Sequence, residues 1–406
     1  MSEKFQSAIE NTAFKSLHVS SQNFLHVKSL EYKLSFCEIR NLIEIAIDLQ
    51  MWQEPPLEEI WCDNEQKKKA LLQVKEYWLG LKNTPKTYTF SKPETSHKFT
   101  LVQEKKETLG LGSCPVASAK TRCCNLLTLD AVQSCGFDCS YCSIQSFYNE
   151  NKIVFDTEFG KKLANLKLDA DKRYHIGTGQ SSDSLMWGNR EGILEALFAF
   201  AKANPNVILE FKTKSDNISY LLENEVPNNI LVTWSLNPQI IIDNEERLTA
   251  SLEKRIQSAR ALADKGVLVG FHFHPIILYK GWQNDYENIA KTLLESFTCK
   301  EVCLVSMGTL TFIKPVLKKL RNRAIQSKIL QMPLVDASGK YSYPLEVKEE
   351  IFSTLYQAFK PWHNEVFFYM CMEDESLWQK VFGYEYEDNE KFERDMLNSY
   401  FAKIKG

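Results

Sequence analysis

Apolar residues follow two different spacings along the chain, and the change between them divides the sequence into regions. Over residues 37–49 and 65–81 they recur at the spacing of an amphipathic helix, as at Ile39, Leu42 and Ile43. We therefore predict that residues 1–112 form a mostly helical N-terminal region, in which no motif indicates a role. Residues 84–97 and 110–122 are predicted to be loops, because they are rich in turn-forming and small polar residues.

From about residue 124, short apolar runs alternate with amphipathic stretches. The runs predict strands over residues 125–132, 173–177, 207–213, 230–236, 267–275 and 301–306. The stretches between them predict helices over residues 157–166, 192–202, 217–223, 251–265, 285–297 and 312–323. Continuous apolar strands that alternate with helices are typical of a parallel sheet buried on both faces. Six such units predict an α/β fold, a partial (β/α)6 TIM-like barrel over residues 113–373, with its chemistry at the carboxyl ends of the strands.

The alternation becomes less regular after residue 323. Here we predict a strand over residues 328–335, a turn over 336–340, a helix over 347–359 and a further strand over 365–372. Residues 374–406 are predicted to form an acidic helical tail.

Composition narrows the class of protein. The chain is 44% hydrophobic and 25% charged, which is typical of a globular protein with a sizeable core. No apolar run is long enough for a membrane span, and the N-terminus lacks an apolar signal core, so we expect a cytoplasmic location. The net charge of −3 gives no global case for nucleic-acid binding. In a reducing compartment, the eleven cysteines favour metal binding or catalysis over disulfides.

Three of these cysteines lie close together in the stretch S-C-G-F-D-C-S-Y-C-S-I-Q. Cys135, Cys139 and Cys142 follow the first predicted strand, which places them at the mouth of the predicted barrel. Three thiolates leave a tetrahedral zinc site incomplete, but they can hold three irons of a [4Fe–4S] cluster and leave the fourth iron open. A zinc site, a structural iron–sulfur site or a chance grouping are the alternatives.

The C-x3-C-x2-C motif resembles that of the radical S-adenosylmethionine (SAM) superfamily, and later segments resemble its spore photoproduct lyase branch. Those segments are G-T-G-Q-S-S-D-S-L, F-K-T-K-S-D-N, W-S-L-N-P, G-F-H-F-H-P-I-I-L-Y-K-G-W and M-C-M-E. The resemblance covers about residues 114–383. It implies a [4Fe–4S] cluster whose open iron binds SAM, and cleavage of SAM to a 5′-deoxyadenosyl radical. It also implies repair of ultraviolet-damaged DNA carrying a thymine-dimer-type lesion.

Several residues at predicted strand ends are candidates for binding the cofactor. Gly177 and Gly179 lack side chains, so the backbone there can approach a ligand closely. The resemblance implies that Ser182 contacts SAM and that Lys214 pairs with its carboxylate. A simple turn and a solvated surface lysine are the alternatives for G-T-G and for Lys214.

The resemblance implies the same kind of contact for two further residues. Ser235 and Asn237 end the fourth predicted strand, and their hydroxyl and amide groups suit a ribose or an amino-acid moiety. Asn237 precedes a proline, so a turn is the alternative there. Tyr141, inside the cysteine motif, is a candidate catalytic residue that can hydrogen-bond or stack near the adenine.

The sequence departs from the lyase pattern at three places that concern the substrate. Gln180 stands where the lyases carry a cysteine that donates a hydrogen atom to the product radical. Ser143 stands where they carry a relay tyrosine. The hairpin that wedges into DNA is shortened to V-D-A-S-G-K-Y-S-Y, in which Lys340 and Tyr341 are the residues that can touch a lesion.

Other cysteines offer a substitute for the missing donor. Cys371 ends the last predicted strand and is a candidate catalytic residue, although a buried free cysteine is usually inert. Cys114, Cys123 and Cys124 precede the cluster motif and are candidates for a second cluster, for protection or for donation. Cys299 and Cys303 are expected to be structural. His272 and His274 alternate with phenylalanines, so both are expected on one face of the fifth strand, more as satisfied interior histidines than as metal ligands.

A basic stretch is the one local feature that favours DNA. Six basic residues and no acidic residue lie between Lys314 and Lys328, and such a face can neutralise phosphates. A solvated helix face is the alternative. We also expect a reducing partner such as flavodoxin or ferredoxin. Three hypotheses thus stand: a radical SAM lyase that repairs DNA, a radical SAM enzyme with a non-DNA substrate, and a non-enzymatic iron–sulfur protein.

Overall fold

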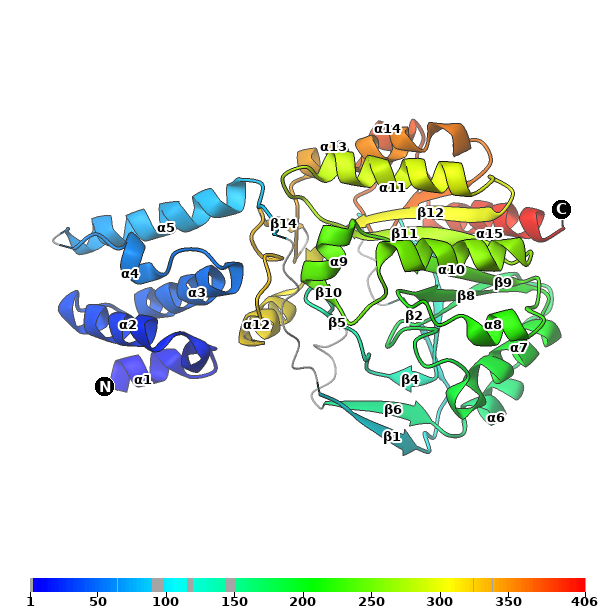
Figure 1. Ribbon diagram of the computed structural model, residues 1–406, viewed down its shortest axis with the longest axis horizontal. Coiled ribbons are helices and arrows are strands. Elements are labelled where there is room, and N and C mark those ends of the chain that lie inside the picture. The colour runs from blue at the N-terminus through cyan, green and yellow to red at the C-terminus, as the bar shows by residue number, and fades with distance from the viewer. Residues whose placement is uncertain are drawn as a thin grey trace. The chain divides into compact units, whose positions relative to one another are not determined.

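The computed structural model describes residues 3–63, 65–89, 98–114, 120–143, 151–323, 325–337 and 339–405. It consists of two compact units (Figure 1). A helical unit comprises residues 1–93, 278–280 and 311–343, and an α/β unit comprises residues 94–277, 281–310 and 344–406. The fold class is therefore mixed α/β with a largely helical N-terminal region.

The helical unit forms its core from amphipathic helices, as the spacing predicts. Its N-terminal helices are α1 (Glu3–Ile9), η1 (Phe14–Ser16), α2 (Val19–Glu31), α3 (Phe36–Trp52), α4 (Leu57–Ile60) and α5 (Lys67–Asn83). α3 begins with a capping box, in which the Ser35 hydroxyl accepts a hydrogen bond from the Glu38 amide and Glu38 accepts one from the Ser35 amide. It ends at Gln53, whose φ of 59° is left-handed.

A segment distant in sequence completes this unit. α12 (Lys314–Asn322) buries Val316 and Leu320, and α12 contacts α3. Beside it lies a small sheet in the order β13 (Thr311–Phe312), β15 (Lys340–Ser342) and β14 (Val335–Ala337). Within the turn predicted over residues 336–340, Asp336, Ala337 and Lys340 belong to the strands of a hairpin, Gly339 has a φ of +81°, and residue 338 lies outside the described residues.

The strand predicted over residues 328–335 is wrong for most of its length. Residues 328–334 form no strand, because this segment is held to the end of α3 instead of to a neighbouring strand. The Ser327 amide donates to the Met51 carbonyl at 2.9 Å, and Lys328 pairs with Glu54.

An eight-stranded sheet is the centre of the α/β unit. Seven strands are parallel and follow one another in chain order, and β2 (Gly110–Ser113) pairs antiparallel at one edge. The parallel strands are β3 (Leu127–Asp130), β7 (Tyr174–Thr178), β8 (Val207–Thr213), β9 (Ile230–Ser235), β11 (Leu268–Ile276), β12 (Val302–Thr309) and β16 (Phe367–Met370). The predicted strands are thus present and parallel, with β16 as a seventh beyond the six repeating units. In the described residues the edge strands β2 and β16 do not pair with each other.

Helices connect the parallel strands and cover the sheet (Figure 1). They are α6 (Phe159–Ala164), η3 (Arg190–Gly192), α7 (Ile193–Ala203), α8 (Ser219–Glu223), α9 (Gln239–Glu245), α10 (Leu252–Asp264), α11 (Trp282–Ser296), α13 (Leu345–Ala358) and η4 (Lys360–Trp362). α10 begins with the Ser251 side chain accepting from the Lys254 amide, and Gly266 follows its end with a φ of +83°. A serine N-cap and a left-handed glycine after the last turn are common helix boundaries.

The C-terminal segment belongs to the α/β unit. α14 (Ser376–Phe382) and α15 (Asn389–Lys405) follow β16, and α15 contacts β8, β12 and β16. Tyr400 lies against His175, 5.5 Å between ring centroids, and against Phe367. Since His175 and Phe367 lie at the beginnings of their strands, α15 packs at the amino ends of the sheet.

The boundary expected at residues 112/113 is also displaced. Residues 100–104 form β1 (Thr100–Glu104), which pairs with β6 (Lys152–Asp156), and Gly110–Ser113 forms β2 instead of a loop. Two short strands complete the unit, β4 (Val132–Gln133) and β5 (Asp138–Cys139). Main-chain pairing with the α/β unit, which no side-chain pattern indicates, places these residues there. Residues 90–97 and 115–119 of the two predicted loops lie outside the described residues.

In the part of the chain that the structure describes, no helix is long and apolar enough to cross a membrane.

Candidate active site

The loop that carries the three cysteines is anchored by its own backbone. β5 pairs antiparallel with β10 (Glu246–Arg247), so that Cys139 lies opposite Glu246. The Ser140 amide donates to the Glu245 carbonyl at 2.8 Å, and the Ser140 hydroxyl donates to the Glu245 carboxylate. Because β10 directly follows α9, the segment after the end of β9 supports the cluster loop.

Glu246 is the central acceptor of this support, and its side chain is fully buried. Its Oε1 accepts from the Tyr141 hydroxyl and, at 2.7 Å, from Asn237 Nδ2. Its Oε2 accepts from the equally buried Arg255 at 2.6 Å. Burial raises the pKa of Glu246, but Arg255 and Lys214 outweigh it, so the pKa lies below its usual value and the carboxylate stays charged.

The three thiols lie within electrostatic reach of one another. Burial raises the pKa of Cys139 and of Cys135, and the neighbouring Cys142 thiol raises both further, whereas Lys214 lowers them. The thiols of Cys135 and Cys139 are therefore protonated on their own and need a cation to replace their protons, as thiolate ligands of a metal centre do. In the described residues, no three His, Cys, Asp or Glu side chains are arranged to hold a single metal ion. Three thiols from one loop are the donor set that a cluster with one open iron requires.

Asp183 joins two strand ends beside this loop. Its Oδ1 accepts from the amides of Leu185 and Met186 and from the Thr213 hydroxyl, and its Oδ2 accepts from the Lys214 amide at 2.7 Å. These bonds fix the turn after β7 against the end of β8. Asp183 thus orients the backbone of Lys214, whose ammonium lies 5.9 Å from the centre of the Tyr141 ring.

The two predicted glycines are closely surrounded by protein atoms. A Cβ at Gly177 would lie 3.1 Å from the Leu126 side chain. Gly179 has a φ of +84°, and a Cβ there would lie 2.9 Å from the Lys212 carbonyl and 2.6 Å from the Ser184 hydroxyl. Only glycine therefore fits at residue 179, and the close approach that is visible is to the protein's own backbone. A contact of Gly177 and Gly179 with a cofactor stays a prediction.

The remaining predicted cofactor residues gather at the same edge of the sheet. Ser182 is buried, and its hydroxyl accepts from the Trp187 ring nitrogen at 3.3 Å. Ser235 ends β9, and its carbonyl accepts from Arg255. Asn237 is fully buried, and its amide is engaged at both ends, because its oxygen also accepts from the Tyr286 hydroxyl at 2.6 Å. The structure therefore shows Asn237 as a support of Glu246, and its contact with SAM stays a prediction.

A buried polar network lies deeper on the same face of the sheet. His272 bonds to Glu210 at 2.6 Å and to Ser306 at 2.9 Å, and His274 bonds to Ser306 at 2.7 Å. The two histidines thus share one face, as the alternation predicts. They are satisfied by neighbouring side chains, and burial, with the nearby Lys212, lowers the pKa of His272 to about 4.

The other cysteines occupy two settings. All eleven cysteines lie in the described residues, and none of them is in a disulfide. Cys299 donates to Glu365 at 2.9 Å at the beginning of β12, and Cys303 is buried in that strand. Cys114, Cys123, Cys124 and Cys371 lie within electrostatic reach of one another on the face of the sheet that carries Lys212.

Three supporting residues were not predicted from the sequence: Glu246, Arg255 and Tyr286. The available signal was the acidic stretch N-E-E-R over residues 244–247, shortly after a predicted strand end. The positions of Arg255 and Tyr286 in the sequence do not indicate that they contact Glu246 or Asn237, because the two residues lie on separate helices, α10 and α11.

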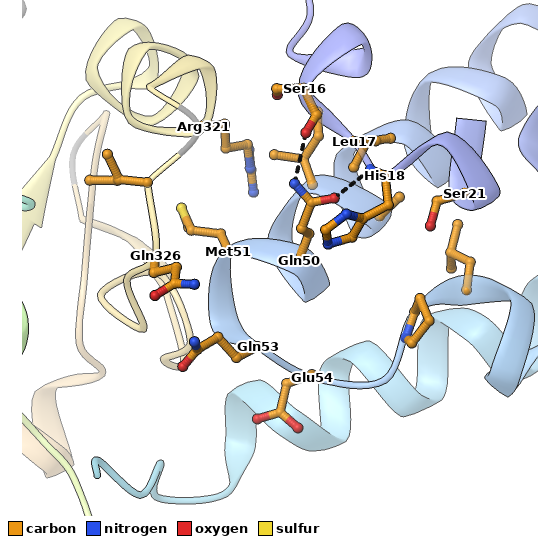
Figure 2. Close-up of a pocket in the computed structure, with 15 residues that line it drawn as sticks. Ser16, Leu17, His18, Ser21, Gln50, Met51, Gln53, Glu54, Arg321 and Gln326 are labelled. Carbon is orange, nitrogen blue, oxygen red and sulfur yellow. Dashed lines mark hydrogen bonds between the residues drawn. The ribbon is translucent and has the colours of Figure 1, made fainter. Parts of the chain in front are cut away.

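The helical unit contains a cavity of its own (Figure 2). It has a volume of about 480 Å³, and its lining includes Leu17, Met51 and the amide side chains of Gln50, Gln53 and Gln326. Gln50 closes one side, because it donates to the Ser16 carbonyl at 2.9 Å and accepts from the His18 amide at 2.8 Å. No residue of the predicted cofactor site lines this cavity.

Comparison with known proteins supports the resemblance. Residues 128–345 match the family model for spore photoproduct lyase. The chain belongs to the spore photoproduct lyase family. Spore photoproduct lyase from Clostridium acetobutylicum is 27% identical over 179 residues, which are 43% of this chain and 53% of that protein. The chain thus spans about half the length of that relative.

Solved structures of family members share the fold. Spore photoproduct lyase complexed with dinucleoside spore photoproduct matches with a TM-score of 0.56 and 20% identity over 66% of this chain and 82% of that one. A mutant with bound AdoMet and dinucleoside spore photoproduct matches with a TM-score of 0.56 and 20% identity over 70% and 87%. At this identity the likeness shows the fold of the chain.

Proposed function

We propose that this protein is a radical SAM enzyme that holds a [4Fe–4S] cluster through Cys135, Cys139 and Cys142 and repairs a DNA photolesion of the spore photoproduct type. The parallel sheet would be the partial barrel of such enzymes. The observation that carries the proposal is the anchored loop with three thiols within electrostatic reach of one another at the carboxyl edge of the sheet, in a member of this family.

The cluster, when bound, supplies the electron that cleaves SAM to a 5′-deoxyadenosyl radical. The chain's own residues hold the reactants in place. Glu246 orients Tyr141 and so shapes the cluster loop, and Asp183 fixes the backbone of Lys214. The Lys214 ammonium would pair with the carboxylate of SAM, and Ser182, Ser235, Asn237, Gly177 and Gly179 would border the cofactor. Tyr141 would lie near the adenine. SAM bound to a family structure supports this cofactor.

DNA as the substrate is supported by the lesion bound in family structures and by the basic stretch of α12. The six basic residues over 314–328, four of them in α12, are not equivalent. Arg321 pairs with Asp48 and Lys328 with Glu54, so these two serve the helical unit. Lys314 and Lys318 are exposed and would contact phosphates. The lesion would have to leave the duplex to reach a site at the sheet edge.

A non-DNA substrate for the same chemistry is the second candidate. Gln180 favours it, because this residue is exposed and an amide cannot give up a hydrogen atom as a thiol does. Ser143, which is also exposed, stands where the lyases carry the relay tyrosine. The hairpin of β14 and β15 has three residues in each strand.

The test uses the full chain, reconstituted with iron and sulfide without oxygen and reduced by dithionite. We expect 5′-deoxyadenosine from SAM and loss of dinucleoside spore photoproduct. Cys139→Ala is expected to abolish both, while Cys303→Ala, another buried thiol, retains them. Deoxyadenosine without loss of the lesion would favour the non-DNA candidate. No deoxyadenosine from a protein with its full iron content would contradict radical SAM chemistry and favour a non-enzymatic iron–sulfur binding protein.

A further inference from the structure

Side chains on one face of the central sheet form successive layers below the cluster loop. Along β8, Glu210 and Lys212 face the same side, and Lys214 continues this alternation just past the strand. Lys214 acts electrostatically on Cys139 and lies near Tyr141, so it belongs to the layer of the proposed cofactor. Lys212 therefore lies one layer deeper, about 7 Å below it along the strand.

Cys371 lies in the Lys212 layer, because Lys212 Nζ is 3.5 Å from Nδ1 of His274, a neighbour of Cys371, and Lys212 acts electrostatically on the Cys371 thiol. In the register between β12 and β16, Tyr369 is paired with Ser306, the partner of both interior histidines, so Cys371, two residues further, shares their face. The Cys371 amide donates to the Met307 carbonyl at 2.8 Å. A Cβ at Gly308 would lie 3.5 Å from the Cys371 carbonyl and 3.2 Å from the His274 ring, so these groups are immediate neighbours.

Three further thiols approach Cys371 from the segment that precedes the cluster loop. Thr121 forms a β-bridge with Asp374, and the Glu375 amide donates to the Lys120 carbonyl at 2.9 Å. This pairing brings Cys123 and Cys124 beside the residues that follow β16. The Cys114 amide donates to the Leu126 carbonyl at 3.0 Å, which places Cys114 at the same segment.

The four thiols differ in their suitability as hydrogen-atom donors. Cys123 and Cys124 are buried, and a hydrogen bond from the Cys124 thiol lowers the pKa of Cys123, which favours a thiolate without an S–H bond. Burial raises the pKa of Cys371 to about 12, which keeps its S–H bond at neutral pH. Cys371 also retains some accessible surface and sits on the sheet face that bears the proposed cofactor.

We propose that Cys371 donates the hydrogen atom that quenches the substrate radical, an inference that rests on the radical chemistry proposed above. The radical left on the lesion, after the 5′-deoxyadenosyl radical has taken a hydrogen, takes the hydrogen atom of the Cys371 thiol. A C–H bond forms, the S–H bond breaks, and the unpaired electron remains on Cys371 Sγ. One electron from a one-electron reductant of the flavoprotein or ferredoxin class, together with one proton, restores the thiol.

The experiment uses the reconstituted full chain, dithionite, SAM and dinucleoside spore photoproduct in D2O, where thiols carry deuterium. We expect the wild-type protein to place one deuterium in each repaired product. Iron content and deoxyadenosine formation of Cys371→Ala are expected to stay within about twofold of the wild type. Its yield of deuterated product is expected to fall at least tenfold. The matched control is Cys303→Ala, a buried thiol at the beginning of the adjacent strand β12, which should behave like the wild type.

Two results would overturn this assignment while leaving SAM cleavage in place. One is unchanged deuterated product from Cys371→Ala, or its loss from Cys114→Ala instead. The other is deoxyadenosine formation by the wild-type protein with no repair of the dinucleoside. Absence of deoxyadenosine in the wild-type protein would refute the proposed function itself, so the two failures can be told apart.

Discussion

Each unit of this protein buries one carboxylate against an arginine, and the two pairs have different neighbours. In the helical unit, Asp48 accepts two bonds from Arg321, at 2.8 and 3.0 Å, and one from the Trp78 ring nitrogen at 3.1 Å. In the α/β unit, Glu246 accepts from Arg255 but also from Tyr141 in the cluster loop. Both carboxylates need their arginine, because an unpaired buried charge is strongly unfavourable.

The two carboxylates differ in their second hydrogen-bond donor, which is Trp78 for Asp48 and Tyr141 for Glu246. Trp78 is part of the packing between α3 and α5, where it stacks on Trp52. Tyr141 lies between two of the proposed cluster ligands. The first pair therefore stabilises a core, whereas the second also holds a site, and substitutions can separate the two roles.

The largest effect is expected from Glu246→Gln. This change leaves Arg255 buried without its counter-charge, so the free energy of unfolding should fall by about 3–5 kcal/mol. It also weakens the acceptor of Tyr141, so affinity for the cluster should fall by about 10- to 100-fold, as for other residues that support metal ligands. Chemical denaturation and iron content at limiting iron measure the two effects. Loss of stability with unchanged iron binding would contradict the supporting role.

A smaller loss is expected from Asp48→Asn in the helical unit. Arg321 is 19% exposed, so water can reach the guanidinium, and the free energy of unfolding should fall by only about 2 kcal/mol. Iron content and deoxyadenosine formation should remain those of the wild type. If this variant lost its cluster as Glu246→Gln does, the contrast between the two carboxylates would be invalid.

A third buried carboxylate, Glu210, is paired with histidines, and His272→Gln tests this arrangement. Burial and Lys212 lower the pKa of His272 to about 4, against about 6.5 in the unfolded chain. The unfolded state therefore binds more protons between these values, and the free energy of unfolding falls as the pH decreases from about 6.5 to 4. The substitution should reduce this slope by up to about 1.4 kcal/mol per pH unit. An unchanged slope in denaturation curves at several pH values would show that His272 does not titrate in this range.

The smallest effect on stability is expected from exchanging the exposed lysines of α12. Lys314→Glu together with Lys318→Glu should change the free energy of unfolding by less than about 0.5 kcal/mol, because neither residue takes part in the Asp48 or Glu54 pairs. The salt dependence of DNA binding should lose about two counterions in its logarithmic slope. Lys161→Glu with Lys291→Glu, two exposed lysines of the α/β unit, is the matched control. Equal effects in both double variants would argue against α12 as the DNA-contacting surface.

The sequence predicted most of the secondary structure, because burial imposes a readable period on each element. β8, predicted at residues 207–213, has these bounds in the structure, and α10 differs from its prediction by one residue at each end. The predictions failed where backbone bonds or contacts with distant residues decide the conformation. Gly110–Ser113 has no apolar alternation, yet it pairs along β3, and the segment after residue 327 is held by a carbonyl and an ion pair.

The same division holds for the site. The sequence by itself determined the chemistry available, because three thiols within eight positions must lie together wherever the loop goes. It also determined the faces of His272 and His274, because alternation along a strand is a local property. Only the tertiary structure decided that Glu246 and Arg255 support Tyr141, that α12 belongs with α3, and that Cys371 shares a layer with Lys212. These contacts join residues distant in the chain, and their geometry depends on how whole strands and helices pack together.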